Sequence, residues 1–132
     1  MLDTDVCIYI INKTPSSYLH KFEMLEQRYD IAISAIVLAE LQYGIANSHH
    51  QQQNQINLDN FLDRLNIMDF SAKCASYYGE LRAKLKRGGI TIGGNDLLTA
   101  SHALCEDATL VTNNMSEFEQ VPGLMTENWD RP

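Results

Sequence analysis

The sequence predicts an α/β fold in which a central parallel β-sheet of Rossmann-like topology is flanked by helices. Two observations lead to this class. Short apolar runs typical of strands alternate with longer segments whose apolar residues recur every three or four positions, as on one face of a helix. Consecutive parallel strands require a crossover connection, which is normally helical. The 132 residues, 45% of them apolar, fit one domain over residues 1–132.

Capping residues and breakers set the expected limits of the elements. Ser34 and Ser71 are expected N-caps, Asp5 is an expected cap after the first strand, and Gly88 is an expected helix stop. The segment NNMSEF after the last strand is expected to be a loop. The predicted order is a strand over 2–5, helices over 6–11 and 15–28, a strand over 31–33, helices over 35–45 and 58–65, a strand over 67–70, helices over 72–87 and 96–104, and a strand over 108–112.

Composition narrows the setting in which the chain works. No apolar run approaches the roughly 20 residues that cross a bilayer, and the N-terminus lacks a signal-peptide pattern, so a cytoplasmic protein with no membrane contact is expected. Cys7, Cys74 and Cys105 are widely spaced and form no C-x-x-C pair, which disfavours a disulfide framework or a zinc ribbon. They are expected to be buried thiols.

The formal net charge of −7 disfavours nucleic-acid binding over the surface as a whole. One local basic segment is the exception, because four of the ten basic residues fall within six positions before a Gly-Gly pair. These cations complement the dipole at the end of a helix, and they are also candidates for contacts to an RNA backbone. The four residues are Arg82, Lys84, Lys86 and Arg87.

Three carboxylates are the candidates for chemistry. Asp3 ends a strand, Glu40 lies on a helix and Asp96 lies in the first turn of a helix, where the helix dipole favours its ionised form. Ligands of open parallel sheets gather beyond the carboxyl ends of the strands, where these groups can converge. Three carboxylates form the oxygen donor set that Mg²⁺ or Mn²⁺ prefers. Singly, each also has a simpler interpretation as a turn, surface or capping residue.

The histidines add no metal ligand to this hypothesis. His102 follows Asp96 by six positions, which places it about 240° around the helix at 100° per residue. A structural role is therefore expected for His102. His49 and His50 lie in a Gln-rich segment and are expected at the surface.

Four segments together resemble one family: MLDTDVCIYII, ISAIVLAELQYG, IGGNDLLTASHAL and LVTNNMSEFEQVPGL. In this order and spacing they are similar to the PIN-domain ribonucleases, specifically the VapC-type toxins of bacterial VapBC toxin–antitoxin pairs. The resemblance covers nearly the whole chain. It implies a single PIN domain over residues 1–132, acting as a Mg²⁺- or Mn²⁺-dependent endoribonuclease that is usually dimeric.

The resemblance also assigns residues by position. The family's acidic positions fall on Asp3, Glu40 and Asp96, which are thereby implied to be catalytic metal ligands. The fourth position, often an aspartate, falls on Asn114, which adds no charge but can orient a water molecule. Thr112 matches a family hydroxyl that supports a carboxylate. Two further acids have a main interpretation and a lesser one: Asp5 as a helix cap or an outer acid, and Glu117 as a loop residue or a substitute for the fourth acid.

The activity implied by the resemblance is hydrolysis of RNA, such as tRNA, by metal-activated water that leaves a 5′-phosphate and a 3′-hydroxyl. A VapB-type antitoxin is the implied partner. It is expected to lay an apolar helix or strand into a groove and to approach the acids with Arg or Lys. The apolar residues Tyr18, Phe22 and Tyr43 could serve a dimer, an antitoxin or the core.

Two other functions remain open at this point. The Asp3-Thr4-Asp5 segment also resembles the strand-end motif of haloacid-dehalogenase-type phosphatases, in which Asp3 would be the nucleophile and Asp5 the acid/base. That interpretation leaves Glu40 without a role and lacks convincing Ser/Thr and Lys motifs. A catalytically silent PIN fold that only binds proteins is the other alternative, motivated by Asn114.

Overall fold

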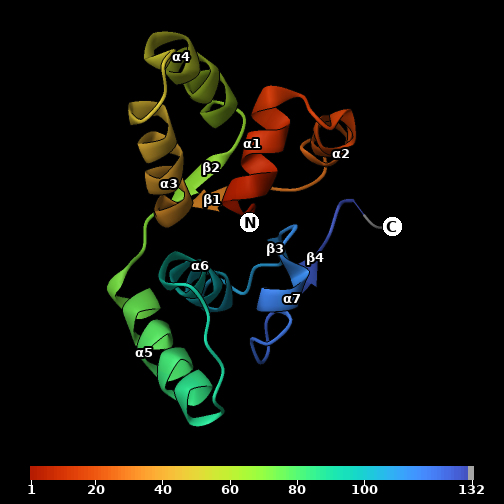
Figure 1. Cartoon of the computed structure of the whole chain (residues 1–132). Helices are drawn as coiled ribbons and strands as arrows, with labels where there is room; N and C mark the ends of the chain where they lie inside the picture. Colours follow the sequence, from red (N-terminus) through yellow and green to blue (C-terminus); the bar gives the residue numbers. More distant parts are fainter. Residues whose placement is uncertain (131–132) are drawn as a thin grey trace.

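The structure is a computed structural model that describes residues 1–130. Pairs of helices alternate with single strands along most of the chain, and every strand is short (Figure 1). The elements are α1 (Thr4–Asn12), α2 (Ser16–Leu25), β1 (Ala32–Ser34), α3 (Ala35–Ala46), α4 (Gln51–Leu62), β2 (Asn66–Met68), α5 (Ala72–Arg87), α6 (Gly94–Cys105), β3 (Leu110–Val111), α7 (Met115–Phe118) and β4 (Thr126–Glu127).

The strands form two parallel pairs, β1 with β2 and β3 with β4. The N-terminal residues join them. The Leu2 N–H donates to Ala32 O at 2.9 Å, and Leu2 forms a parallel bridge with Val111. The main chain of Leu2 therefore makes one parallel arrangement out of the two pairs, as the sequence predicted for the fold class. Asp3 follows directly, at the carboxyl end of this central segment.

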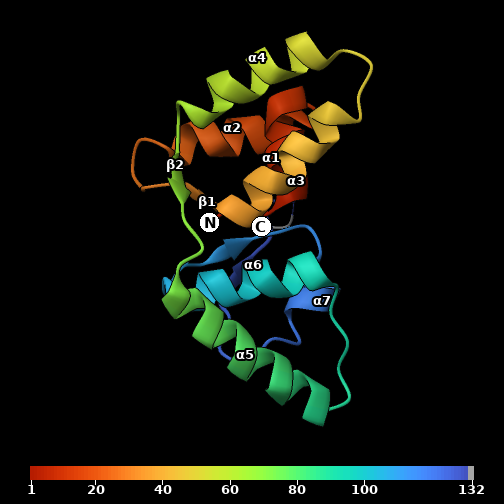
Figure 2. The ribbon, with the colours of Figure 1, turned by 90° about the vertical axis from the view of Figure 1, so that its left-hand side faces the viewer.

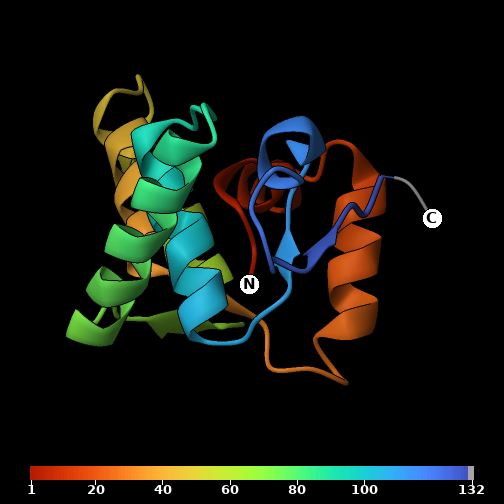
Figure 3. The ribbon, with the colours of Figure 1, turned by 90° about the horizontal axis from the view of Figure 1, so that it is seen from below.

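Two apolar cores lie on opposite sides of the strands. In Figure 2, α1 to α4 lie on one side and α5, α6 and α7 on the other. Leu110 packs into the core of α5, α6 and α7, whereas Val111 packs into the core of α1 to α4. This division follows from the strand, because successive side chains point to opposite faces. Seen from below, α5 and α6 run side by side (Figure 3).

Several predicted limits are close to those in the structure, but the strand expected over 2–5 is shorter because α1 begins at Thr4, and the helix expected over 58–65 begins earlier, at Gln51. Ser34 and Ser71 cap α3 and α5 by accepting hydrogen bonds from the N–H groups of Ile36 and Cys74, and α5 ends before Gly88. Within residues 1–130, no helix combines the length and the apolar character that crossing a bilayer requires.

Other expectations were wrong or missed an element. Asp3, rather than Asp5, caps the first helix, because its extended backbone lets its carboxylate accept the Thr4 N–H at 2.8 Å. The segment after β3 contains the short helix α7 rather than only a loop. Strand β4 was not predicted, since its two residues, Thr126 and Glu127, carry no periodicity. Of the roles left open for Tyr18 and Phe22, the structure supports the core, because both are buried.

Candidate active site

Asp3 is held at the carboxyl end of the central segment by four main-chain and side-chain contacts. Its N–H donates to Val111 O at 2.9 Å, which fixes its backbone against β3. Its Oδ1 accepts from the Thr4 N–H at 2.8 Å, and its Oδ2 accepts from Thr112 Oγ1 at 2.8 Å. The Cys7 N–H donates to its carbonyl oxygen at 3.1 Å, as in a helical turn. Only 5% of Asp3 is exposed, so its carboxylate has one fixed orientation.

Glu40 reaches the same region from α3. The Ser34 cap starts this helix, and Glu40 lies in its second turn, half-buried. Thr4 Oγ1 donates to Glu40 Oε1 at 2.9 Å. Thr4 therefore connects the two acids, with its N–H on Asp3 and its hydroxyl on Glu40. Sequence reasoning missed Thr4, although its position between two aspartates was a signal.

Asp96 and Glu117 form a pair at the start of α6. Asp96 lies in the first turn of α6, as predicted, and its carboxyl group hydrogen bonds with Glu117. Glu117 Oε1 accepts the Gly93 N–H at 2.7 Å, and Glu117 Oε2 accepts from Asn114 Nδ2 at 2.6 Å. The sequence favoured a loop role for Glu117, but the structure places its carboxylate beside Asp96. Asn114 orients Glu117 and brings no charge of its own.

Gly93 lies close to both members of this pair. A Cβ at this position would lie 3.7 Å from Asp96 Oδ2 and 3.7 Å from Glu117 Oε1. Its N–H faces Glu117 directly, which is how the loop before α6 meets α7. Sequence reasoning did not select Gly93, although the Gly-Gly pair before Asn95 was visible in the motif.

A hydroxyl relay connects Asn114 to Asp3. The Asn114 N–H donates to Thr112 Oγ1 at 2.9 Å, and that hydroxyl donates to Asp3 Oδ2. Because Oγ1 accepts one bond and has a single proton, its donation to Asp3 is fixed. The predicted hydrogen bond from Thr112 to a carboxylate is therefore confirmed. Thr112 is 1% exposed, so solvent does not compete for this bond.

The electrostatics show that these acids repel one another. Burial raises the pKa of Asp3, and hydrogen bonds from Thr112 and Thr4 oppose this shift. The charges of Asp5 and Glu40 raise the pKa of Asp3 further. The pKa of Asp96 is raised to about 7, first by burial, then by Glu117 and, more weakly, by Asp3 and Glu40. Burial also acts to raise the pKa of Glu117, but hydrogen bonds involving Gly93, Asp96 and Asn114 bring it below its ordinary value.

The donor set fits a divalent cation bound by oxygen atoms. Among residues 1–130, no Lys or Arg side chain forms an ion pair with Asp3, Glu40, Asp96 or Glu117. Buried negative charge without a cation is unfavourable, and a divalent ion offsets it. Within the same part of the chain, the carboxylate oxygens of Asp3, Glu40 and Asp96 do not all lie within 4.8 Å of one another. Mg²⁺ tolerates such spacing because it retains several water ligands.

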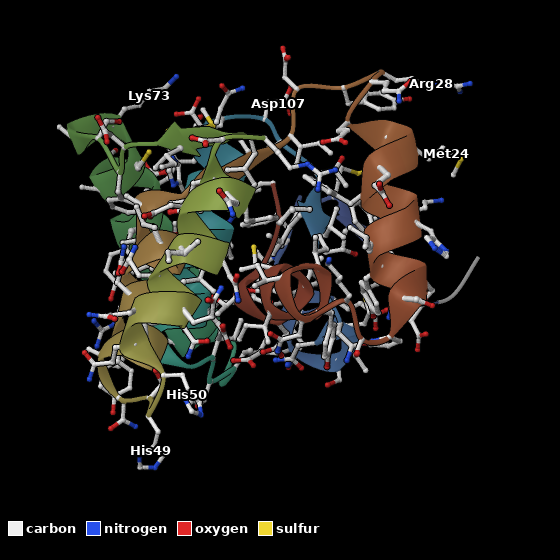
Figure 4. All side chains as sticks on the ribbon, turned by 90° about the horizontal axis from the view of Figure 1, so that it is seen from above. Met24, Arg28, His49, His50, Lys73 and Asp107 are labelled. Atoms are coloured by element: carbon white, nitrogen blue, oxygen red, sulfur yellow. The ribbon has the colours of Figure 1, made fainter. Side chains whose placement is uncertain are left out.

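Other predicted residues lie elsewhere. Asp5 is exposed in the first turn of α1 and forms no hydrogen bond to the cluster through its side chain among the described residues. Lys84, Lys86 and Arg87 are exposed in the last turn of α5, and Arg82 donates to Tyr78 Oη at 2.9 Å. His49 and His50 project from the turn between α3 and α4, as expected (Figure 4).

A parallel α/β fold in which acids from α3, α6 and the cap of α1 lie beyond the carboxyl ends of the strands defines a class of metal-dependent nucleases. The family model of the PIN domain matches residues 1–124. The chain therefore belongs to the PIN-domain family, as the resemblance implied.

Similar proteins of known name identify a smaller group within the PIN-domain family. The chain is 60% identical over 131 residues to Ribonuclease VapC2 of Rickettsia felis, which covers 99% of this chain and 98% of that protein. It is 37% identical over 129 residues to the tRNA(fMet)-specific endonuclease VapC of Shigella flexneri, covering 98% and 96%. It matches the crystal structure of VapBC2 from Rickettsia felis bound to a DNA fragment from their promoter, with a TM-score of 0.94, 59% identity and 98% of both chains covered. These matches confirm the resemblance to VapC-type ribonucleases.

The phosphatase alternative is not favoured by these findings. It needs Asp5 beside Asp3 as the acid/base, and Asp5 is exposed on the outside of the first turn of α1. It also gives no role to Glu40, which Thr4 ties to the site. The alternative of a silent binding protein is likewise disfavoured, because relatives along the whole chain are named ribonucleases.

Proposed function

We propose that this chain is a Mg²⁺- or Mn²⁺-dependent endoribonuclease and the toxin of a VapBC-type pair. The observation that carries the proposal is the acidic edge, defined here as Asp3, Glu40, Asp96 and Glu117. Burial, and then the charge of neighbouring carboxylates, raises the pKa of Asp3 and Asp96, and no Lys or Arg within residues 1–130 forms an ion pair with them. A bound Mg²⁺ or Mn²⁺ would supply an activated water and stabilise charge on the phosphodiester.

Each residue of the acidic edge has a separate task. Asp3, Glu40 and Asp96 would hold the cation, with Asp3 fixed by Thr112 and Glu40 fixed by Thr4. Glu117, oriented by Asn114, supplies the negative charge that Asn114 itself lacks. Its hydrogen bond to Asp96 holds that carboxyl group in place. Asp5 contributes only at longer range, through its charge.

The substrate class is RNA, and tRNA is the specific proposal. It is supported by the relative of Shigella flexneri, which is named a tRNA(fMet)-specific endonuclease and is 37% identical. Arg82, Lys84, Lys86 and Arg87 would contact the RNA backbone, since they offset the net charge of −7 locally. The protein is proposed to act in the cytoplasm as a homodimer, with the whole chain forming one PIN domain.

A VapB-type antitoxin is the proposed partner. A groove of about 240 Å³ lies between α1, α3 and α4 and includes Glu40 in its wall. Its apolar lining comes chiefly from Ile8, Ile11, Leu41 and Ile45. Tyr43, on α3, is 71% exposed. An apolar antitoxin segment in this groove would lie next to the acidic edge, which a basic side chain could then reach.

The test uses the full-length chain purified away from any antitoxin and incubated with tRNA and with messenger RNA. Cleavage that requires Mg²⁺ or Mn²⁺, stops with EDTA and leaves 5′-phosphate ends is expected. If Mg²⁺ added after chelation restores cleavage, the loss of activity in EDTA is due to removal of the metal and not to unfolding of the protein. Absence of cleavage across both RNA classes, with the protein folded, would contradict the enzyme proposal. Equal cleavage of both classes would reject only the tRNA preference.

A further inference from the structure

Ligand-type side chains converge at the C-terminal half of α6, away from the acidic edge. Cys74 of α5, His102 of α6 and Glu106 directly after α6 present one ligand atom each, and these atoms lie within 4.8 Å of one another. Asp96 and Cys105 lie near opposite ends of α6, about 14 Å apart along the helix axis at 1.5 Å per residue. This group is therefore separate from the nuclease site.

His102 supplies an unpartnered buried atom aimed into this group. Its side chain is 0% exposed, and within residues 1–130 its Nε2 has no hydrogen-bond partner. Glu106 Oε1 lies 4.0 Å from Nε2, which is too long for a hydrogen bond. A buried polar atom without a partner is unfavourable, because the hydrogen bonds it made with water are lost and not replaced. A ligand bound to Nε2 would therefore be favourable at this position.

The other ring nitrogen is already engaged. His102 Nδ1 lies 2.7 Å from Ser34 Oγ, which also accepts the Ile36 N–H at 3.0 Å. When Nδ1–H donates to this oxygen, Nε2 carries a lone pair, and this is the arrangement of metal-binding histidines. Burial lowers the pKa of His102, although Glu106 opposes this, and so favours the neutral form of the ring.

We propose that Cys74, His102 and Glu106 bind one divalent cation of the Zn²⁺ type, with Cys105 as the neighbouring thiol that can take the fourth position. Sulfur and imidazole donors favour Zn²⁺, whereas Mg²⁺ and Mn²⁺ prefer oxygen. Cys105 Sγ lies 3.2 Å from Cys74 Sγ. Two thiolates on one tetrahedral Zn²⁺, with Zn–S bonds of about 2.3 Å, lie about 3.8 Å apart. The two sulfur atoms therefore need to separate only slightly.

The remaining adjustment of the ligand positions falls on Glu106, the exposed ligand. Tetrahedral ligand atoms lie about 3.5 Å apart, against a limit of 4.8 Å in this group. Glu106 is exposed and can move inward by this amount without disturbing the core. Phe70 packs edge-on against the His102 ring, with the ring centroids 5.4 Å apart, and so holds the imidazole in place.

The bound cation would connect parts of the molecule that serve the acidic edge. Cys74 belongs to α5, and His102 belongs to α6, which carries Asp96. Through Nδ1, His102 contacts Ser34 at the start of α3, the helix that carries Glu40. The cation would thus be structural, fixing α5, α6 and the start of α3 together and leaving the chemistry to the acidic edge.

The test titrates the chelator-treated, reduced full-length chain with Zn²⁺, and with Co²⁺ as an optical probe, in excess Mg²⁺. One equivalent is expected to bind, to raise the melting temperature and, for Co²⁺, to produce a thiolate-to-metal charge-transfer absorption. Glu106→Gln changes an exposed side chain and preserves the fold, and Cys74→Ala removes the central thiol. Each is expected to weaken binding by at least the roughly 10- to 100-fold that loss of a supporting residue costs.

Two matched controls make the outcome decisive. Cys7→Ala removes a buried thiol outside the group, and Asp96→Asn removes a carboxylate of the acidic edge; both are expected to retain Zn²⁺ binding. No charge-transfer band, or equal Zn²⁺ affinity in the wild-type chain, Glu106→Gln and Cys74→Ala, would overturn the proposal. Loss of Zn²⁺ in Asp96→Asn but not in Cys74→Ala would also overturn it, by placing the ion at the acidic edge.

Discussion

The two ends of α6 present opposite chemistry. At the N-terminal end, Asp96 lies beside Glu117 at a half-exposed edge, and the pKa of Asp96 is raised to about 7. At the C-terminal end, His102 and Cys105 are buried, and Cys105 contacts Cys74. One end crowds carboxylates that repel one another, and the other gathers buried thiol and imidazole groups. The comparison teaches that one helix can provide hard oxygen donors and soft donors at separate places.

The largest effect should follow from removing a ligand of the acidic edge. Asp3→Asn keeps the size of the side chain and can still accept the Thr4 N–H, but it loses the charge. RNA cleavage by this variant should fall by more than about 100-fold, because removal of an outer supporting residue alone costs about 10- to 100-fold. Initial cleavage rates at saturating Mg²⁺ measure this. Unchanged Zn²⁺ binding in the same variant would show that the sites at the two ends of α6 bind their ions independently.

A smaller loss is expected from the hydroxyl relay. Thr112→Val removes the hydrogen bond to Asp3 Oδ2 and leaves the Asn114 N–H without its acceptor. Cleavage should fall about tenfold, and the free energy of unfolding should fall by about 1–2 kcal/mol. Kinetics and denaturant unfolding measure the two effects. Thr112→Ser retains the hydroxyl and should restore most of the rate; failure of this rescue would assign the effect of Thr112→Val to packing.

The burial of Asp96 among other carboxylates predicts a pH dependence of stability. The pKa of Asp96 is about 7 in the folded chain against 3.8 for the free group, so the folded state holds its proton more tightly. Stability from this group is therefore present at acid pH and lost as the pH rises from about 4 through about 7. Denaturant unfolding in EDTA should show this loss.

Asp96→Asn should flatten that pH profile, and saturating Mg²⁺ should flatten it in the wild-type chain. Asp59→Asn changes an exposed carboxylate on α4 and is the matched control, which should leave the profile as it is. A profile that is identical in Asp96→Asn and the wild-type chain would show that Asp96 does not titrate as described.

Local signals explain the parts of the fold that sequence predicted well. Helix α5 begins after Ser71 and ends before Gly88, as expected, because caps and breakers act within a few residues. The prediction that Ser34 is the N-cap of α3 is correct for the same reason. Asp3 and Asp5 are both good caps locally, and the choice between them depends on the pairing of Leu2 with Val111, which is a tertiary contact.

The site was predictable in part. Asp3, Glu40 and Asp96 were found because each stands at the end or on the face of a recognisable element. The role of Glu117 beside Asp96 was underestimated, since the contact depends on the short helix α7 and the Gly93 N–H. The group around Cys74 and His102 joins residues far apart in sequence, with no recognisable spacing, so only the packing of α5 on α6 reveals it.

The smallest effect concerns the basic end of α5. Replacing the exposed Lys84 and Lys86 together with alanine should weaken RNA binding and leave the rate at saturating RNA nearly unchanged. If both contact phosphates, the slope of log affinity against log salt should become less steep by about 1.4, at about 0.7 per contact for single strands. Lys73→Ala, at the other end of α5, is the matched control. An unchanged slope in the double variant would show that Lys84 and Lys86 do not contact RNA phosphates.

The most direct test of the central claim measures Mn²⁺ binding and RNA cleavage together in the wild-type chain, Asp96→Asn and Asp59→Asn. The acidic edge predicts that Asp96→Asn loses both Mn²⁺ affinity and cleavage, while Asp59→Asn retains both. Circular dichroism establishes that each variant is folded. Cleavage by Asp96→Asn at the wild-type rate, or wild-type Mn²⁺ affinity in that variant, would contradict the claim that these carboxylates hold the catalytic metal.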